Sequence, residues 1–211
     1  MRLAALLVAA GLDGQSSVSW PGAETEDPEI VRVSHDSRSV ASGDLFCCVA
    51  GGTHDGHRFA ADAVATGAAG LLVERSVIDA SVPVVRVPSV RQAIGPLAAA
   101  LHSWPSRSLD LVGVTGTNGK TSVVHLLRSI LTASGRRAES WGTLSGERTT
   151  PEGTDLQATI ASWVAGGVDA AALEVSSHAL AQHRVDGTTF AAVAFTTLGR
   201  DHLDFHGSME D

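Results

Sequence analysis

One stretch of the chain carries the residue types that bind nucleotide phosphates. An apolar run over 109–114 leads into a glycine-rich turn, which ends in the pair Lys120-Thr121. Glycines let backbone N–H groups turn inward around phosphate oxygens, and a helix that begins at the lysine adds its partial positive charge. Lys120 would reach the β and γ phosphates, and the Thr121 hydroxyl would ligate Mg²⁺. The candidate ATP-binding residues are Gly116, Thr117, Asn118, Gly119, Lys120, Thr121 and Ser122.

The spacing of this loop departs from the strict Gly-x4-Gly-Lys-[Ser/Thr] rule. Val114 stands where the first glycine should be, and Gly113 comes one residue early. The alternative is a chance glycine-rich turn. Against it stands the composition, because the chain has 15 basic residues and only Lys120 among them is a lysine. We therefore expect a nucleotide-phosphate site at this loop.

Carboxylates and histidines at two other places are candidate metal ligands. Glu174 ends an apolar run, and a carboxylate at the carboxyl end of a parallel strand would lie beside the phosphate loop. A solvated strand end is the alternative, and the phosphate loop favours a Mg²⁺ ligand. Near the end of the chain, Asp201, His202, Asp204 and His206 have the composition of a zinc site. No cysteine joins them, and Mg²⁺ held by oxygen atoms suits an ATP site better.

The composition excludes several other functions. The chain has 211 residues, 44% of them hydrophobic, so it can bury a core. Its net charge of -8 argues against a nucleic-acid partner, which needs a basic face. No apolar run reaches the roughly 18 residues of a membrane helix. Cys47 and Cys48 are adjacent in an apolar run, which favours buried free thiols and a cytoplasmic location.

Strands and helices must alternate to position these groups. A polar loop over 13–29 follows a first helix, and a Pro/Ser break at 103–108 places a domain boundary near residue 106. Strands that alternate with helices predict an α/β fold with a mainly parallel sheet covered on both faces. The expected strands span 30–33, 44–49, 71–73, 84–87, 109–114, 138–141, 170–175 and 190–196, and the expected helices span 1–12, 56–67, 89–101, 120–133 and 155–165.

Five motifs in order resemble one family, the Mur ligases, and within it the UDP-N-acetylmuramoyl-tripeptide synthetases. The loop Gly116-Thr117-Asn118-Gly119-Lys120-Thr121 is the variant that Mur ligases share with folylpolyglutamate synthetases. The other motifs are His35-Asp36-Ser37-Arg38, Thr149-Thr150-Pro151-Glu152, Glu174-Val175-Ser176-Ser177-His178 with Gln182-His183-Arg184, and Asp201-His202-Leu203-Asp204. His35-Asp36-Ser37 could be mistaken for a hydrolase triad, but triad members rarely stand in a row.

The resemblance implies a reaction and a set of roles. ATP would phosphorylate the D-Glu carboxylate of UDP-N-acetylmuramoyl-L-Ala-D-Glu, and the amine of a diamino acid, meso-diaminopimelate or L-lysine, would displace the phosphate in peptidoglycan synthesis. Lys120, Glu174 and His202 would be catalytic, and Thr121, Glu174 and His202 would serve Mg²⁺. The UDP-substrate contacts would be His35, Ser37, Gly52, Thr53, His54, Thr149, Thr150, Ser176, Gln182 and Arg184. The role of Arg148 stays open, and Thr197 and Gly199 replace the family's usual amide and hydroxyl.

By the same resemblance, residues 1–105 would be a small α/β uridine-nucleotide domain and 106–211 part of a P-loop ATPase domain. The family's C-terminal domain, and a lysine that binds the second Mg²⁺, have no counterpart here, so the sequence is expected to be an N-terminal fragment, inactive alone and monomeric. A folylpolyglutamate synthetase-like ligase is one alternative, against which residues 1–105 argue. A non-enzymatic nucleotide-binding module is the other.

Overall fold

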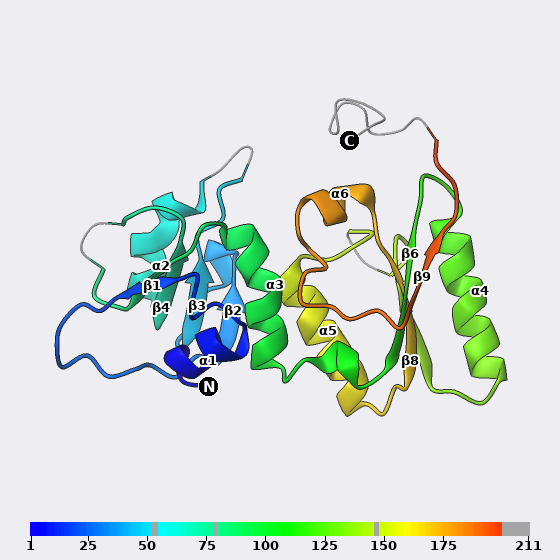
Figure 1. Ribbon diagram of the computed structural model, residues 1–211, viewed down its shortest axis with the longest axis horizontal. Helices are drawn as coiled ribbons and strands as arrows, with labels where there is room; N and C mark the ends of the chain where they lie inside the picture. The colour runs from blue at the N-terminus through cyan, green and yellow to red at the C-terminus, as the bar shows by residue number, and fades with distance from the viewer. Residues whose placement is uncertain (52–54, 78–79, 146–147, 200–211) are drawn as a thin grey trace. The chain divides into compact units, whose positions relative to one another are not determined.

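The computed structural model describes residues 1–51, 55–77, 80–145 and 148–199. The chain divides into two compact units, Met1–Ser103 and Trp104–Asp211, so the division falls within the Pro/Ser break at 103–108, slightly before the boundary expected near residue 106. Each unit has its own sheet flanked by helices (Figure 1). No helix in the described ranges is both long and apolar enough to cross a membrane.

The first unit is built on a five-stranded sheet in the order β1-β5-β4-β3-β2. Strand β1 runs antiparallel to β5, and the other neighbours are parallel. Its elements are α1 (Leu3–Ala9), β1 (Ser17–Ser19), β2 (Arg32–Ser34), the 3₁₀ turn η1 (Ser37–Ser39), β3 (Asp44–Cys47), η2 (Gly56–Phe59), α2 (Ala60–Thr66), β4 (Gly70–Val73), β5 (Val84–Arg86) and α3 (Val90–Leu101).

Side chains that alternate along the strands bury both faces of this sheet. Phe46 and Leu71 pack with Ala60 and Ala63 of α2 in one cluster. Leu45, the neighbour of Phe46 in β3, projects to the opposite face. A Cβ added at Gly70 would meet the side chains of both Leu45 and Leu3, so Leu45 lies on the face toward Leu3 of α1. Helices α1 and α3 contact each other, and α3 also contacts β2. Cys47 and Cys48 are buried and free, as predicted, and burial raises the pKa of the Cys48 thiol to about 12.

The second unit has a parallel four-stranded sheet in the order β7-β8-β6-β9. Helix α4 covers one face through a cluster around Val114, Val124 and Ala172, and α5 covers the other through Leu156 and Ile160. Its elements are η3 (Pro105–Arg107), β6 (Asp110–Thr115), α4 (Lys120–Ala133), β7 (Ala138–Trp141), α5 (Gly153–Ala165), β8 (Ala170–Glu174), α6 (Ser177–Ala181) and β9 (Ala192–Phe195). The predicted α/β class with mainly parallel sheets is confirmed.

Two local predictions were wrong, and one helix was missed. The expected polar loop over 13–29 contains strand β1, whose short Ser-Val-Ser sequence pairs with β5 only through the tertiary fold. The strand expected over 30–33 forms at Arg32–Ser34, because the Ile30 amide bonds to the Met1 carbonyl instead of to the sheet. Helix α6 was not expected. Its Ser176 cap, whose hydroxyl accepts from the Ala179 amide, was the signal that could have found it.

Candidate functional site

The glycine-rich loop leads from the carboxyl end of β6 into the first turn of α4. Val114, which stands where the strict motif has glycine, is fully buried in β6 and packs in the cluster that joins the sheet to α4. The strand therefore extends through this position, and the turn begins after Thr115. Gly116 has a φ of +126°, and a Cβ there would lie 2.3 Å from the Thr196 hydroxyl, so this position requires glycine.

The Lys120 side chain folds back over this loop. Its Nζ donates to the Gly116 carbonyl at 2.6 Å and to the Thr117 carbonyl at 3.1 Å. The ammonium group is thus held at the concave side of the turn, where it can meet phosphate oxygens. Such a cation at the beginning of a helix attracts an anion both by its own charge and by the helix dipole.

Glu174 lies beside the loop because β8 pairs with β6 in a register that sets Glu174 opposite Val114. Its side chain is 1% exposed. The Thr121 hydroxyl donates to its Oε2 at 3.1 Å, and the Thr143 amide donates to its Oε1 at 3.0 Å. Within the described ranges, no Arg, Lys or His forms an ion pair with Glu174. A buried carboxylate without a cationic partner is costly, so this site fits a bound cation.

The hydroxyl and carboxylate oxygens of Thr121 and Glu174 are the ligand type that Mg²⁺ prefers. These two residues would hold the ion at the first turn of α4. Among the described residues no group of three His, Cys, Asp or Glu side chains could form a metal cluster. His202, together with Asp201, Asp204 and His206, lies outside the described residues.

Residues 142 and 143 complete the surroundings of Glu174, and sequence reasoning missed them. A Cβ at Gly142 would lie 1.9 Å from Glu174 Oε1, so only glycine allows the carboxylate this position. The Thr143 hydroxyl donates to Glu174 Oε2 at 3.3 Å and lies 3.0 Å from the Thr149 hydroxyl. The sequence signal was a Gly-Thr pair directly after a strand, which parallel pairing brings to the same edge as Glu174.

The five substrate-contact residues expected in the second unit lie in one network next to Glu174. The buried Thr150 hydroxyl donates to the Glu174 carbonyl at 2.8 Å and accepts from the Ser176 amide at 3.0 Å. Arg184 donates to the Thr150 carbonyl at 3.2 Å and to Gln182 Oε1 at 2.7 Å. Thr149 is reached through Thr143. The structure therefore connects the five residues through hydrogen bonds to the backbone and side chain of Glu174.

Glu152 adds a carboxylate to this network. Its Oε1 lies 3.1 Å from Arg184 Nη2 and also accepts from Arg148, the arginine whose role the sequence left open. Arg148 thus shares a carboxylate with Arg184 and helps to hold the 148–152 segment. The Arg184 side chain is only 14% exposed, which places its charge at the inner edge of the network.

Two residues that depart from the family pattern still contact the phosphate loop. Thr197 accepts from the Asn118 amide through its hydroxyl at 3.2 Å, and its carbonyl accepts from the Thr117 amide at 2.8 Å. Gly199 donates its amide to the Thr117 hydroxyl at 2.8 Å. Thr197 therefore contacts the loop through both its side chain and its backbone, whereas Gly199 acts through its backbone.

The remaining candidates lie in the first unit. His35 and Ser37 follow the carboxyl end of β2 and are both half-buried. Gly52, Thr53 and His54 lie outside the described residues. The two groups of candidates belong to different units of the chain.

Two family models match the sequence. The Mur ligase middle domain matches residues 114–211, and the model of the Mur ligase family catalytic domain matches residues 29–102. The chain belongs to the Mur ligase family. The N-terminal match also argues against the folylpolyglutamate alternative, as residues 1–105 did in the sequence.

Individual relatives agree with this family. The UDP-N-acetylmuramoyl-L-alanyl-D-glutamate--2,6-diaminopimelate ligase of Geobacillus kaustophilus is 46% identical over 194 residues, which cover 88% of this chain and 40% of the relative. A solved structure of a ligase with the same name matches with a TM-score of 0.76 and 29% identity over 90% of this chain and 41% of that one. A MurF ligase from Thermotoga maritima, solved in complex with ADP, matches with a TM-score of 0.64 and 24% identity over 88% of this chain and 42% of that one, and shows the shared fold. This Mur ligase chain spans about 40% of the length of the curated relatives it matches.

Proposed function

We propose that these 211 residues form the ATP-binding and UDP-substrate-binding part of a ligase that adds a diamino acid to UDP-N-acetylmuramoyl-L-Ala-D-Glu. The observation that carries the proposal is the pairing of the phosphate loop with a buried carboxylate, Thr121 with Glu174. The names of the relatives favour 2,6-diaminopimelate over L-lysine as the amino acid.

The reaction requires a poor leaving group to become a good one. The γ-phosphoryl group of ATP is transferred to the D-Glu carboxylate, which gives an acyl phosphate and ADP. The amine of the diamino acid then attacks the acyl carbon, the C–O bond to phosphate breaks, and the amine loses a proton. The protein's task is to position the groups and to neutralise their charge.

The residues of this chain divide that task. Lys120 and the loop amides bind the phosphate groups of ATP, and Thr121 and Glu174 hold Mg²⁺. The ion, when bound, neutralises phosphate oxygens and orients them. Arg184 supplies positive charge to a substrate that carries a diphosphate and carboxylates, and Thr149, Ser176 and Gln182 orient it. Ser37 and His35 bind the uridine-diphosphate end. The proposed setting is the cytoplasm, where ATP is available.

The proposal is tested with a hybrid protein. The aligned 194 residues of the Geobacillus kaustophilus relative are replaced by the matching residues of this chain, and the rest of the relative is kept. With MgATP, UDP-N-acetylmuramoyl-L-Ala-D-Glu and 2,6-diaminopimelate, the hybrid should release phosphate and form the tripeptide product. The same hybrid with Lys120→Ala is the negative control. A hybrid that binds both nucleotides but forms no product would contradict the proposal.

A further inference from the structure

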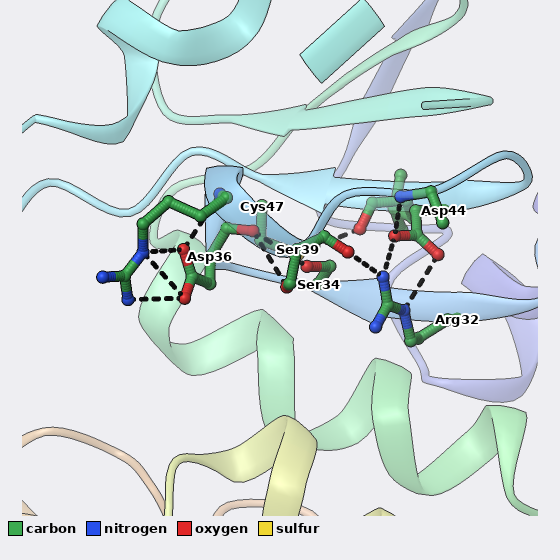
Figure 2. A network of polar contacts seen from close by, with 9 residues as sticks. Arg32, Ser34, Asp36, Ser39, Asp44 and Cys47 are labelled. Atoms are coloured by element: carbon green, nitrogen blue, oxygen red, sulfur yellow. Dashed lines mark hydrogen bonds and ion pairs between the residues drawn. The ribbon is translucent and has the colours of Figure 1, made fainter. Parts of the chain in front are cut away.

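The first unit contains an ion pair between neighbouring strands, in which a buried carboxylate meets a partly exposed guanidinium. Arg32 of β2 and Asp44 of β3 are register partners in the parallel pairing of these strands. Arg32 Nε donates to Asp44 Oδ1 at 3.0 Å and Nη2 to Oδ2 at 2.5 Å, so the pair is bidentate (Figure 2). The Asp44 side chain is 1% exposed, whereas that of Arg32 is 47% exposed. A planar guanidinium can donate two parallel hydrogen bonds to one carboxylate, whereas the ammonium group of a lysine cannot.

The same pair holds the loop that joins the two strands. Arg32 Nη2 also donates to the Ser39 carbonyl at 2.5 Å, and Asp44 Oδ2 accepts from the Ala41 amide at 2.9 Å (Figure 2). One guanidinium therefore connects both strands with the last residue of η1. The downstream end of the turn is fixed by charge-assisted hydrogen bonds, which are stronger than those between neutral groups.

Asp36 fixes the upstream end of the turn. Its Oδ1 accepts from the Arg38 amide at 3.0 Å and from Arg38 Nε at 2.9 Å, and these bonds lower the pKa of the carboxyl to about 2. The Ser39 hydroxyl donates to the Asp36 carbonyl at 3.1 Å. Ser37 lies between Asp36 and Ser39, the two residues whose contacts fix the ends of the turn. It is half-buried, and its hydroxyl has no hydrogen-bond partner in the part of the chain that the structure describes.

We infer that Arg32 is a positioning residue for ligand binding: paired with Asp44, it holds the η1 turn so that the Ser37 hydroxyl is presented to the UDP end of the substrate. The inference rests on the proposed role of Ser37. Arg32 itself touches no ligand in this account. It acts by fixing the Ser39 carbonyl, and hence the backbone on which Ser37 stands.

The test is a double-mutant cycle on ligand affinity with the 211-residue chain. The Kd of UDP-N-acetylmuramoyl-L-Ala-D-Glu is measured by calorimetry for the wild type, for Ser37→Ala, for Arg32→Gln combined with Asp44→Asn, and for all three substitutions together. Replacing both members of the pair avoids leaving a buried carboxylate unpaired. Arg86→Gln, on β5 of the same sheet, is the matched control, since the Arg86 side chain donates to the Glu74 carbonyl and forms no ion pair among the residues that the structure describes.

We expect the Arg32→Gln/Asp44→Asn variant to bind the ligand about tenfold more weakly, the scale of losing a residue that supports a binding group. Adding Ser37→Ala should then weaken binding little further, because both changes disable the same contact. Urea unfolding and MgATP affinity separate this effect from a general loss of structure, since a merely structural role would leave the Kd of the folded protein unchanged.

Three results would overturn the inference. Unchanged affinity in the Arg32→Gln/Asp44→Asn variant, with weakened binding in Ser37→Ala, rejects the role of Arg32 and leaves the proposed function standing. If the losses in binding free energy of Ser37→Ala and of Arg32→Gln/Asp44→Asn add fully in the triple variant, Arg32 acts independently of Ser37. If Ser37→Ala binds as the wild type does, the proposed role of Ser37 fails, and the positioning role fails with it. If the paired variant does not fold, Arg32→Lys, which keeps a charge beside Asp44 but loses the bidentate contact, takes its place with the same expected loss.

Discussion

The Thr121 hydroxyl donates a 3.1 Å hydrogen bond to Glu174 Oε2, although the two residues are 53 positions apart in the chain. The contact exists because β6 and β8 are neighbours in a parallel sheet, so the loop after one strand meets the carboxylate that ends the other. It links the phosphate-binding loop, the proposed ion site and the substrate network in a single edge of the second unit.

Glu174→Gln should weaken binding of MgATP by tenfold or more, on the order of 1.4 kcal/mol, and should leave binding of ATP without Mg²⁺ nearly unchanged. The glutamine amide lacks the negative charge that binds the ion. Its NH₂ group would also face the Thr121 hydroxyl or the Thr143 amide, which donate to carboxylate oxygens in the wild type. Titration of ATP with and without Mg²⁺ measures both affinities. Equal losses under the two conditions would show that Glu174 does not act through the ion.

Gly142→Ala should destabilise the second unit, because the added Cβ would lie 1.9 Å from Glu174 Oε1. The expected loss in the free energy of unfolding is about 1–3 kcal/mol, as for overpacking of a buried site, together with weaker MgATP binding. Gly14→Ala is the control, since a Cβ there meets nothing within 4 Å. Urea unfolding gives the free energies, and a Gly142→Ala protein as stable as the control would contradict the packing around Glu174.

Thr150→Val should cost about 1–3 kcal/mol of stability, because it leaves the buried Glu174 carbonyl without its donor and the partly buried Ser176 amide without its acceptor. The Thr150 hydroxyl donates to the Glu174 carbonyl and accepts from the Ser176 amide, and a valine side chain can do neither. Thr150→Ser keeps the hydroxyl and should retain most of the stability. If the valine and serine variants unfold at the same urea concentration, the hydroxyl is not part of the network.

Much of this site could be predicted from local sequence. Lys120, Thr121 and Glu174 stood out because a glycine-rich turn and a strand-end carboxylate each have a short pattern. Gly142 and Thr143 were missed because their importance arises only from the pairing of β7 with β8. Likewise β1 was missed because three residues, Ser17–Ser19, carry too little pattern to show that they pair with β5.

Acid should weaken the first unit between about pH 4 and pH 2. Hydrogen bonds from Arg38 lower the pKa of Asp36 to about 2, and those from His57 lower the pKa of Asp55 to about 2, from a usual 3.8. Both carboxyls have a lower pKa in the folded protein than in the unfolded chain. The stability that they contribute is therefore fully present above the pKa of the unfolded chain and is lost as the pH falls through the pKa of the folded protein.

Urea midpoints measured from pH 5 to pH 2 check this expectation. The double variant Asp36→Asn/Asp55→Asn should show a smaller fall over the same range than the wild type. Identical profiles for the two proteins would mean that neither carboxyl is linked to folding.

We expect the chain to hold two separable binding sites, one for MgATP at the loop of Lys120 and one for the UDP-linked dipeptide. The test is calorimetric titration of both ligands into the wild type and into Lys120→Ala, with Arg128→Ala as the control, since the Arg128 side chain of α4 is 47% exposed and pairs with Glu139 of β7. The wild type should bind both ligands. Lys120→Ala should bind MgATP at least tenfold more weakly, since it loses a charge-assisted contact of about 1.5–3 kcal/mol, and should bind the UDP-linked dipeptide as the wild type does. A wild-type chain that binds neither ligand, or a variant that loses both affinities equally, would contradict it.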